Sequence, residues 1–413
     1  MVSFILLFLW DYSKTVMKRF FTLICLLVCV TVSAQDECFN CFGIIAGKAT
    51  TVDGSVMMAH NEDDGGEQML NIYNVPASAD NVKYLWFEFP GMEVADSFMN
   101  EFGVCVASDG CPSREDRKDF TEGGILYGIR VAVAKKAHSA REAVGIIGEL
   151  VEKYGYSGSG RTYVVADPAE GWICSVVQGR HWVAQRVPDD MVMTIPNYYV
   201  IGKIDLSDAD NFAGSSDIVD YAVSRGWYSP EKDGEFNFRL AYASERSLAS
   251  ESSIVRHTNM QNFLFGDAIL GEDVVAVRKP QEKVTIEKLM EALSLPRVCN
   301  DNTILSTVFH LRGWLPVEIG CTAWNAMGHP NVELFKPWTF KTVIPDNCHR
   351  FKTAAEAEEK HFSDSKDKRA NYSESFYWQY VDGWKSKVKD VKAQKKIIKN
   401  FRKADKKLTG SAD

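Results

Sequence analysis

Two cysteines, Cys38 and Cys41, stand three residues apart, after an apolar leader and before a stretch with the pattern of a β-strand. A cysteine attacks a carbonyl carbon as the thiolate, but with an ordinary pKa of about 8.5 only a few per cent is ionised at neutral pH. A base is therefore needed, and no cysteine here lies in a papain-type Cys-His signature. If the chain is cut between Asn40 and Cys41, the new α-amine, with a pKa of about 7.7–8.0, can take the thiol proton and later return it to a leaving group. The sequence thus predicts Cys41 as a nucleophile that carries its own base.

Other interpretations of these residues stay open. Cys38 and Cys41 would suit a redox or metal-binding pair, although a thioredoxin-type pair opens a helix and this pair precedes a strand. No second Cys-x-x-Cys is present to complete a zinc site. The run His60–Asp64 offers oxygen ligands for calcium or magnesium, or its carboxylates are simply solvated.

The strand after Cys41 is predicted to be the first of a hairpin. Asp53-Gly54 separates two apolar-rich runs, which is typical of a two-residue type I′ turn because both central positions need positive φ. An antiparallel hairpin brings its open ends together. We therefore expect Cys41 to lie near the acidic run Glu62, Asp63 and Asp64.

Further strands separated by turn signals follow along the chain, with helices between them. Strands are predicted near residues 84–89, 103–107, 162–195, 306–311 and 317–324, and helices near residues 126–137, 139–154, 216–225 and 287–293. The second of these helices begins with a capping box formed by Ser139 and Glu142. Because hairpins dominate, the pattern predicts an α+β fold with stacked antiparallel sheets rather than a βαβ nucleotide fold.

The leader before the cysteines has the layout of a secretory signal peptide. Met17-Lys18-Arg19 is positively charged, and residues 20–32 form an apolar run that is short for a membrane span. Residues 32–34 are the kind of small residues found at a signal-peptide cleavage site. Residues 1–16 fit poorly in front of it, which favours Met17 as the start; one longer, interrupted anchor is the alternative. After Ala34 no 18-residue apolar run begins, so the mature chain is predicted to be periplasmic or secreted, without a membrane span.

Composition indicates a globular protein with a free thiol. Apolar residues make up 46% of the chain and aromatic residues 12%, as in proteins with a substantial core. The cysteines from Cys41 onward are Cys41, Cys105, Cys111, Cys174, Cys299, Cys321 and Cys348. Their number is odd, so at least one thiol stays unpaired even in an oxidising compartment, and Cys41 is the natural candidate.

The C-terminal segment is strongly basic in a chain whose net charge is −8. The apolar residues Trp384, Val388, Val391, Ile398 and Phe401 recur in it at helical spacing. The sequence predicts an amphipathic helix packed on an acidic body. Contact with an anionic surface or a nucleic acid is the alternative, but no aromatic-interleaved binding motif supports it.

Three segments resemble one known family. The stretch CFGIIAGKATTVDGSVMMAHNEDD, from Cys41 to Asp64, is similar to the opening of the cysteine-type N-terminal-nucleophile dipeptidases. With Gly47-Lys48 and Asp53-Gly54-Ser55 in register, Cys41 rather than Cys38 takes the nucleophile position. The similarity continues in SAREAVGIIGELVEKYG and GRHWVAQRVPDDMVMTIPN, returns in LPVEIGCTAWNAMGHPNVELFKPW, and is weaker at YSESFYWQY.

This resemblance implies an αββα sandwich, removal of a short propeptide by the chain itself, and hydrolysis of an amide bond. The wider group includes the penicillin V and bile-salt acylases. By analogy with it, Asp63 contacts the terminal amine and Asn197 donates to the oxyanion. The implied organisation is a signal peptide (1–34), a propeptide (35–40), a catalytic domain (41–350) and a charged helical extension (351–413).

One position departs from the pattern of that family. Where the family usually has arginine, this chain has His60, a group that is mostly neutral at pH 7. The absence of this permanent positive charge would alter either the activation of the thiol or the contact with a substrate carboxylate. His60 and its neighbour Asn61 are the candidate substrate-binding residues.

The leading hypothesis is therefore an exported cysteine dipeptidase that uses Cys41, Asp63 and Asn197, with no cofactor and no metal. The alternatives are an acylase acting on N-acyl amino acids or bile-salt-like conjugates, and a binding protein that has lost activity through His60. The expected partner is a dipeptide or small amide and not a nucleic acid. A homo-oligomer is compatible with the sequence.

Overall fold

The computed structural model describes residues 41–65, 69–126, 128–363 and 384–410. The predicted signal peptide, the predicted propeptide and the YSESFYWQY segment lie outside the described residues. The described residues all belong to one compact unit.

Two antiparallel sheets form the centre of this unit. In spatial order, the first sheet contains β12 (Val277–Arg278), β10 (Val192–Ile195), β1 (Phe42–Ala46), β2 (Val56–Asp63), β13 (Thr303–Leu311), β14 (Cys321–Met327) and β15 (Lys336–Trp338). The second sheet contains β11 (Phe212–Gly214), β9 (Trp182–Val187), β8 (Gly171–Gly179), β7 (Tyr156–Ala166), β6 (Cys105–Gly110), β5 (Ser97–Asn100), β4 (Tyr84–Glu88) and β3 (Asn71–Val75).

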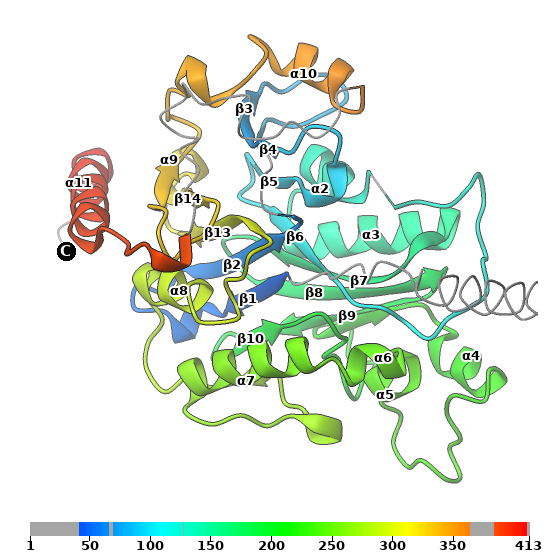
Figure 1. The fold of residues 1–413 in the computed structure, drawn as a ribbon. Helices are drawn as coiled ribbons and strands as arrows, with labels where there is room; N and C mark the ends of the chain where they lie inside the picture. The colour runs from blue at the N-terminus through cyan, green and yellow to red at the C-terminus, as the bar shows by residue number, and fades with distance from the viewer. Residues whose placement is uncertain (1–40, 66–68, 127, 364–383, 411–413) are drawn as a thin grey trace, which may run out of the picture. The chain divides into compact units, whose positions relative to one another are not determined.

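Helices cover the outer faces of both sheets. The helices are α2 (Ile129–Lys136), α3 (Ala140–Tyr154), α4 (Ile218–Ser224), α5 (Phe238–Tyr242), α6 (Glu245–Leu248), α7 (Glu251–Phe265), α8 (Ile286–Leu293), α9 (Val317–Gly320), α10 (Ala354–Lys360) and α11 (Val391–Thr409). Figure 1 shows α3 along the outer face of β7 and β8, and α7 on the outer side of β10. The predicted α+β fold with two stacked antiparallel sheets between helices is confirmed.

Three apolar layers hold this arrangement together. Side chains from both sheets, such as Ile45 and Val164, form the core between the sheets. A second layer packs the second sheet against α2 and α3, and a third packs the first sheet against α7 and α8. Since successive residues of a strand point to opposite faces, a polar residue at an inward position must lie between the two sheets.

The predicted hairpin is present, but its turn is longer than predicted. β1 and β2 pair antiparallel, with Phe42 opposite Asn61. The connection runs from Gly47 to Ser55 and contains a short 3₁₀ helix (Lys48–Thr50), so the two-residue type I′ turn is wrong. Gly54 has φ of +82°, whereas Asp53 is not among the residues with positive φ and instead accepts hydrogen bonds from Ser55.

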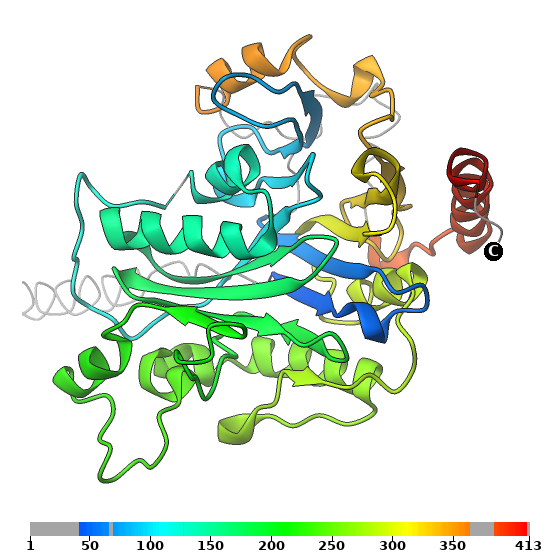
Figure 2. The same cartoon turned by 180° about the vertical axis from the view of Figure 1, so that it is seen from behind.

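The first sheet places Cys41 between Asn197, a predicted site residue, and Glu62 of the acidic run. In the pairing of β1 with β10, Gly43 lies opposite Ile195, so the register continued by two residues brings Cys41 opposite Asn197. In the pairing of β1 with β2, the same reasoning brings Cys41 opposite Glu62. Figure 2 shows the blue hairpin of β1 and β2 beside the green strands of the second sheet.

Local signals predicted α2, α3, α4 and α8, but they missed α7 and the shorter helices α5, α6 and α9, the last of which begins a segment predicted as a strand. The Ser139 side chain caps α3 by accepting a hydrogen bond from the Glu142 amide, as the capping box predicts. No helix was predicted over α7, whose N-terminus is capped by Ser250 and whose buried face includes Arg256, His257 and Gln261. Buried polar residues weaken the apolar periodicity by which an amphipathic helix is recognised.

The basic C-terminal segment forms α11 and packs on the body, as predicted. Ile398 is buried, and the Phe401 ring contacts the Trp324 ring edge-on at 4.9 Å between centroids. Asp405 forms an ion pair with Arg312, and Arg402 forms one with Glu287. Val388 and Val391, although at helical spacing, are exposed.

Within the described residues, no helix combines the length and apolar character needed to cross a membrane. The described cysteines are all buried and none is disulfide-bonded.

Candidate active site

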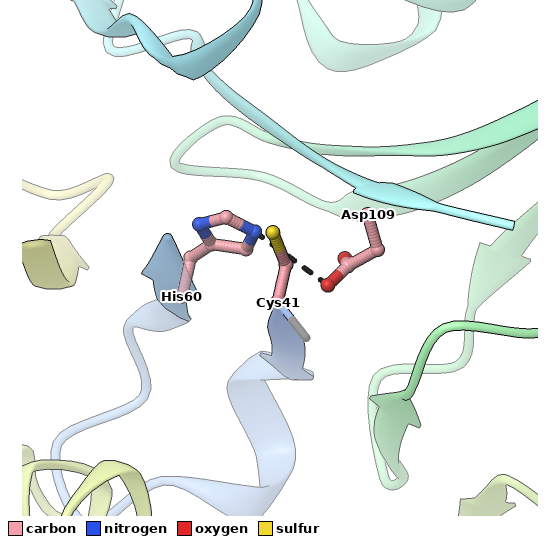
Figure 3. A group of neighbouring side chains, drawn as sticks. All are labelled: Cys41, His60 and Asp109. Carbon is pink, nitrogen blue, oxygen red and sulfur yellow. Dashed lines mark ion pairs between the residues drawn. The ribbon is translucent and has the colours of Figure 1, made fainter. Parts of the chain in front are cut away.

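The Cys41 thiol lies between the two sheets, at the start of β1. Its side chain is only 1% exposed, and its Sγ donates to Glu62 Oε1 at 3.4 Å. The hairpin therefore brings Cys41 to the acidic end of β2, as the sequence predicts. Figure 3 shows the thiol between the imidazole of His60, from β2, and the carboxylate of Asp109, from β6 of the other sheet.

The surroundings of Cys41 keep its thiol protonated. Burial raises the thiol pKa well above its ordinary value, and the nearby carboxylates of Glu62, Asp109 and Asp63 raise it further. Both effects disfavour the negatively charged thiolate. A nucleophile in this position needs a base that takes its proton as it attacks.

His60 and Asp109 face each other across the gap between the sheets. The distance from His60 Nε2 to Asp109 Oδ1 is 3.6 Å, and both side chains are buried. Burial raises the pKa of Asp109, while the facing His60 lowers it. Gly43 makes the approach of the sheets feasible here, since a Cβ at this position would lie 2.9 Å from Asp109 Oδ2.

Glu62 is held by a buried arginine. Arg130, from α2, donates to Glu62 Oε2 at 3.2 Å and to the Asp96 carbonyl oxygen at 2.6 Å. Its other guanidinium nitrogens donate to Ser108. The contact with Arg130 fixes the position of the Glu62 carboxylate, which accepts from Cys41.

Asp63 ends β2 and is only partly satisfied. Its Oδ2 accepts from Asn300 Nδ2 at 2.5 Å, whereas its Oδ1 has no hydrogen-bond partner among the described residues. Burial raises the pKa of Asp63 to about 7, although the charge of Arg256 acts in the opposite direction. The free oxygen is available to a cationic group close to Cys41.

Asn197 and Arg256 complete the surroundings of Cys41. Arg256, from α7, donates to the Cys41 carbonyl oxygen at 2.9 Å and also to Asn197 Oδ1. Asn197 Nδ2 donates to the Gly110 carbonyl oxygen at 3.0 Å. An amide nitrogen has two hydrogens, so the fixed side chain keeps one N–H for another acceptor.

The structure does not bring Asn61 to this cluster. Asn61 lies on the opposite face of β2 from His60, where its Nδ2 donates to the carbonyl oxygens of Leu293 and Val298. Its Oδ1 accepts from Ser306. These bonds tie β2 to the end of α8, so the geometry gives Asn61 a structural role and does not support a contact with substrate.

The alternation of β2 also argues against a hard-cation loop over residues 60–64. His60 and Glu62 point between the sheets, while Asn61 faces α8. The group that is suited to holding an ion in the described part of the chain is a different one, formed by Cys41, His60 and Asp109.

Sequence reasoning missed Asp109, Arg130 and Arg256. Asp109 occupies the last inward position of β6, whose other inward residues, Cys105 and Ala107, are apolar. A carboxylate at an inward position is the signal that was available. The two arginines come from helices far from Cys41 in the sequence, so no local spacing connects them with it.

Comparisons with known proteins agree with this picture. The model of peptidase family C69 matches residues 119–295. A probable dipeptidase B of Streptococcus pyogenes serotype M1 is 23% identical over 366 residues, which are 74% of this chain and 73% of the relative. Dipeptidase A of Lactobacillus helveticus is 24% identical over 370 residues, with 75% of each chain covered.

Among solved structures, penicillin V acylase from Agrobacterium tumefaciens aligns with a TM-score of 0.37 and 13% identity, over 73% of this chain and 87% of that one. The score is low, and no conclusion rests on it. The family model and the curated relatives confirm the predicted resemblance to the cysteine-type dipeptidases, and they indicate that the protein is a hydrolase.

Proposed function

We propose that the protein is an exported cysteine dipeptidase whose nucleophile is the thiol of an N-terminal Cys41. The observation that carries the proposal is the buried thiol at the start of β1, with Glu62, Asn197 and Arg256 held around it. The curated relatives are named as dipeptidases, which supports dipeptides as the substrate class. The leader that ends near Ala34 supports export to the periplasm or the medium.

In the proposed reaction, the α-amine of Cys41 takes the thiol proton while Sγ attacks the carbonyl carbon of the substrate. The oxyanion accepts the N–H of Asn197 that the Gly110 carbonyl does not use. The amine then passes its proton to the leaving nitrogen, and water hydrolyses the thioester. The free Oδ1 of Asp63 holds the amine in place, and His60 faces the substrate beside the thiol.

The same thiol is proposed to release its own amine. Sγ attacks the carbonyl carbon of Asn40, the peptide bond breaks, and hydrolysis of the resulting thioester leaves Cys41 as the first residue. The two groups belong to adjacent residues, so the reaction benefits from a high effective concentration.

A substrate panel tests the proposal. Purified mature protein is incubated with dipeptides, with N-acyl amino acids and without substrate, and released amino groups are measured. Hydrolysis of dipeptides, retained in EDTA, is expected. Exclusive hydrolysis of the acyl amino acids would make the protein an acylase, and no hydrolysis of either class would make it a binding protein.

Asp63 gives a prediction about stability and pH. Its pKa in the folded unprocessed chain is about 7, against an ordinary value of 3.8, so the folded state holds a proton that the unfolded state has lost between these values. The folded state therefore loses stability as pH rises from about 4 to about 7, and the loss persists above that. In an unprocessed Cys41→Ala background, Asp63→Asn is expected to raise the thermal unfolding midpoint more at about pH 8 than at about pH 5. An equal effect at both pH values would mean that Asp63 titrates normally.

A further inference from the structure

Three donor atoms of different chemistry converge beside Cys41. Cys41 Sγ, a ring nitrogen of His60 and a carboxylate oxygen of Asp109 all lie within 4.8 Å of one another. They come from the start of β1, from β2 and from β6, and the three side chains are 1%, 4% and 0% exposed. Both sheets therefore contribute to one closed cluster (Figure 3).

Two of these residues have polar atoms that the described part of the chain leaves without hydrogen bonds. These atoms are His60 Nε2 and both carboxylate oxygens of Asp109. The 3.6 Å between Nε2 and Oδ1 is too long for a hydrogen bond. It is close to the separation of about 3.4 Å between two ligands of a tetrahedral ion with bonds of about 2.1 Å. Buried polar atoms without partners are costly, and an ion between them would satisfy His60 Nε2 and one carboxylate oxygen of Asp109.

We propose that Cys41, His60 and Asp109 form a binding site for a thiophilic divalent cation, with Zn²⁺ as the best match, and that the bound ion inhibits the enzyme reversibly. Zn²⁺ accepts sulfur, imidazole and carboxylate ligands together in tetrahedral sites. The arginine that the resembled family carries in place of His60 has no lone pair to offer. His60 can therefore bind a metal ion at a position where the resembled family has a positively charged arginine.

The fourth ligand is the α-amine of Cys41, and this part of the inference rests on the proposed function. The amine and thiol of one residue close a five-membered chelate ring around the ion. On binding, the thiol gives its proton to solvent as the Zn–S bond forms, and the amine and imidazole bind through nitrogen lone pairs; nothing is oxidised or reduced. The ion then occupies both the nucleophile and its base, so hydrolysis stops.

The other charges around the thiol leave Asp109 available to the ion. Arg130 forms an ion pair with Glu62. Arg256 donates hydrogen bonds to the Cys41 carbonyl oxygen and to Asn197 Oδ1, and its positive charge lowers the pKa of both Asp63 and Asp109. Asp109 faces only His60 at ion-pair distance within the described residues. Its negative charge, together with the thiolate, compensates the two positive charges of the ion.

Cobalt spectroscopy tests the site without relying on activity. Co²⁺ added to metal-free mature protein is expected to give a sulfur-to-cobalt charge-transfer band and the intense visible bands of a tetrahedral ion. Zn²⁺ is expected to displace it stoichiometrically, and X-ray absorption at the zinc edge to show one sulfur and at least one imidazole. Dipeptide hydrolysis, measured separately, is expected to fall in Zn²⁺ and to return in EDTA.

Variants separate this site from adventitious binding. His60→Arg and Asp109→Asn are each expected to weaken Zn²⁺ binding at least about tenfold, because each removes or weakens a ligand. His138→Arg is the matched control, since His138 is exposed on the surface and pairs with Glu142. It is expected to leave the affinity unchanged.

Two outcomes would overturn the inference. One is the absence of the cobalt charge-transfer band in wild-type protein, which needs no variant to fold. The other is an unchanged Zn²⁺ affinity in folded His60→Arg, which would mean that the ion binds Cys41 without His60. Neither outcome affects the proposed function, which would fail instead if metal-free protein did not hydrolyse dipeptides.

Discussion

Replacing Cys41 by alanine is expected to abolish both propeptide removal and hydrolysis, because one thiol performs both reactions. The variant should accumulate as an unprocessed chain that retains Cys38, and it should hydrolyse dipeptides no faster than buffer without enzyme. Its fold should persist, since the thiol makes only a weak 3.4 Å contact with Glu62. Mass spectrometry of the purified protein and a dipeptide assay measure the two effects.

Cys38→Ala is the matched control for this experiment. Cys38 precedes the proposed cleavage site, so the specific activity of the mature enzyme should be nearly unchanged. Cys41→Ser is expected to process slowly and to turn over orders of magnitude more slowly, since a hydroxyl is far less ionised than a thiol. Loss of activity in Cys38→Ala together with activity in Cys41→Ala would show that Cys38 is the reactive cysteine.

Replacing Asn197 by alanine is expected to lower kcat by roughly 10²–10³, about 3 kcal/mol, with a smaller change in KM. The physical reason is that the N–H left free by the Gly110 carbonyl meets negative charge only as the oxyanion develops. Steady-state kinetics on the best dipeptide measure the effect, after mass spectrometry has shown that the variant is processed.

Asn325→Ala is a suitable control for Asn197→Ala. Asn325 is also a buried asparagine of the first sheet, but its Nδ2 donates to Thr307 Oγ1 on β13. This variant should lose some stability and keep its kcat. A kcat loss in Asn197→Ala no greater than that of the control would remove Asn197 from the reaction.

The sequence was most informative where the structure is local. The closeness of Cys41 to Glu62 followed from a hairpin, because pairing within a hairpin is fixed by a short stretch of chain. The turn itself was predicted wrongly, since Asp53-Gly54 ends a longer connection that begins with a 3₁₀ helix. An Asp-Gly pair indicates that the chain turns, whereas the residues around the pair determine the length of the loop.

The parts of the site that were not predicted depend on long-range packing. Asp109 reaches His60 only because the second sheet stacks on the first, and Arg256 reaches Cys41 from a helix that was not predicted. His60 and Asn61 were both predicted to bind substrate, but strand alternation places their side chains on opposite faces of β2. Which face of a strand meets the other sheet is a tertiary property.

The measurement that most directly tests the central claim is the N-terminal sequence of active, secreted enzyme, combined with its intact mass. Sequencing that begins Cys-Phe-Gly-Ile, with a mass that starts at Cys41 and shifts by one label on mild alkylation, is the predicted result. Fully active enzyme that begins Gln-Asp-Glu-Cys would contradict it, because the amine of Cys41 would then be locked in a peptide bond.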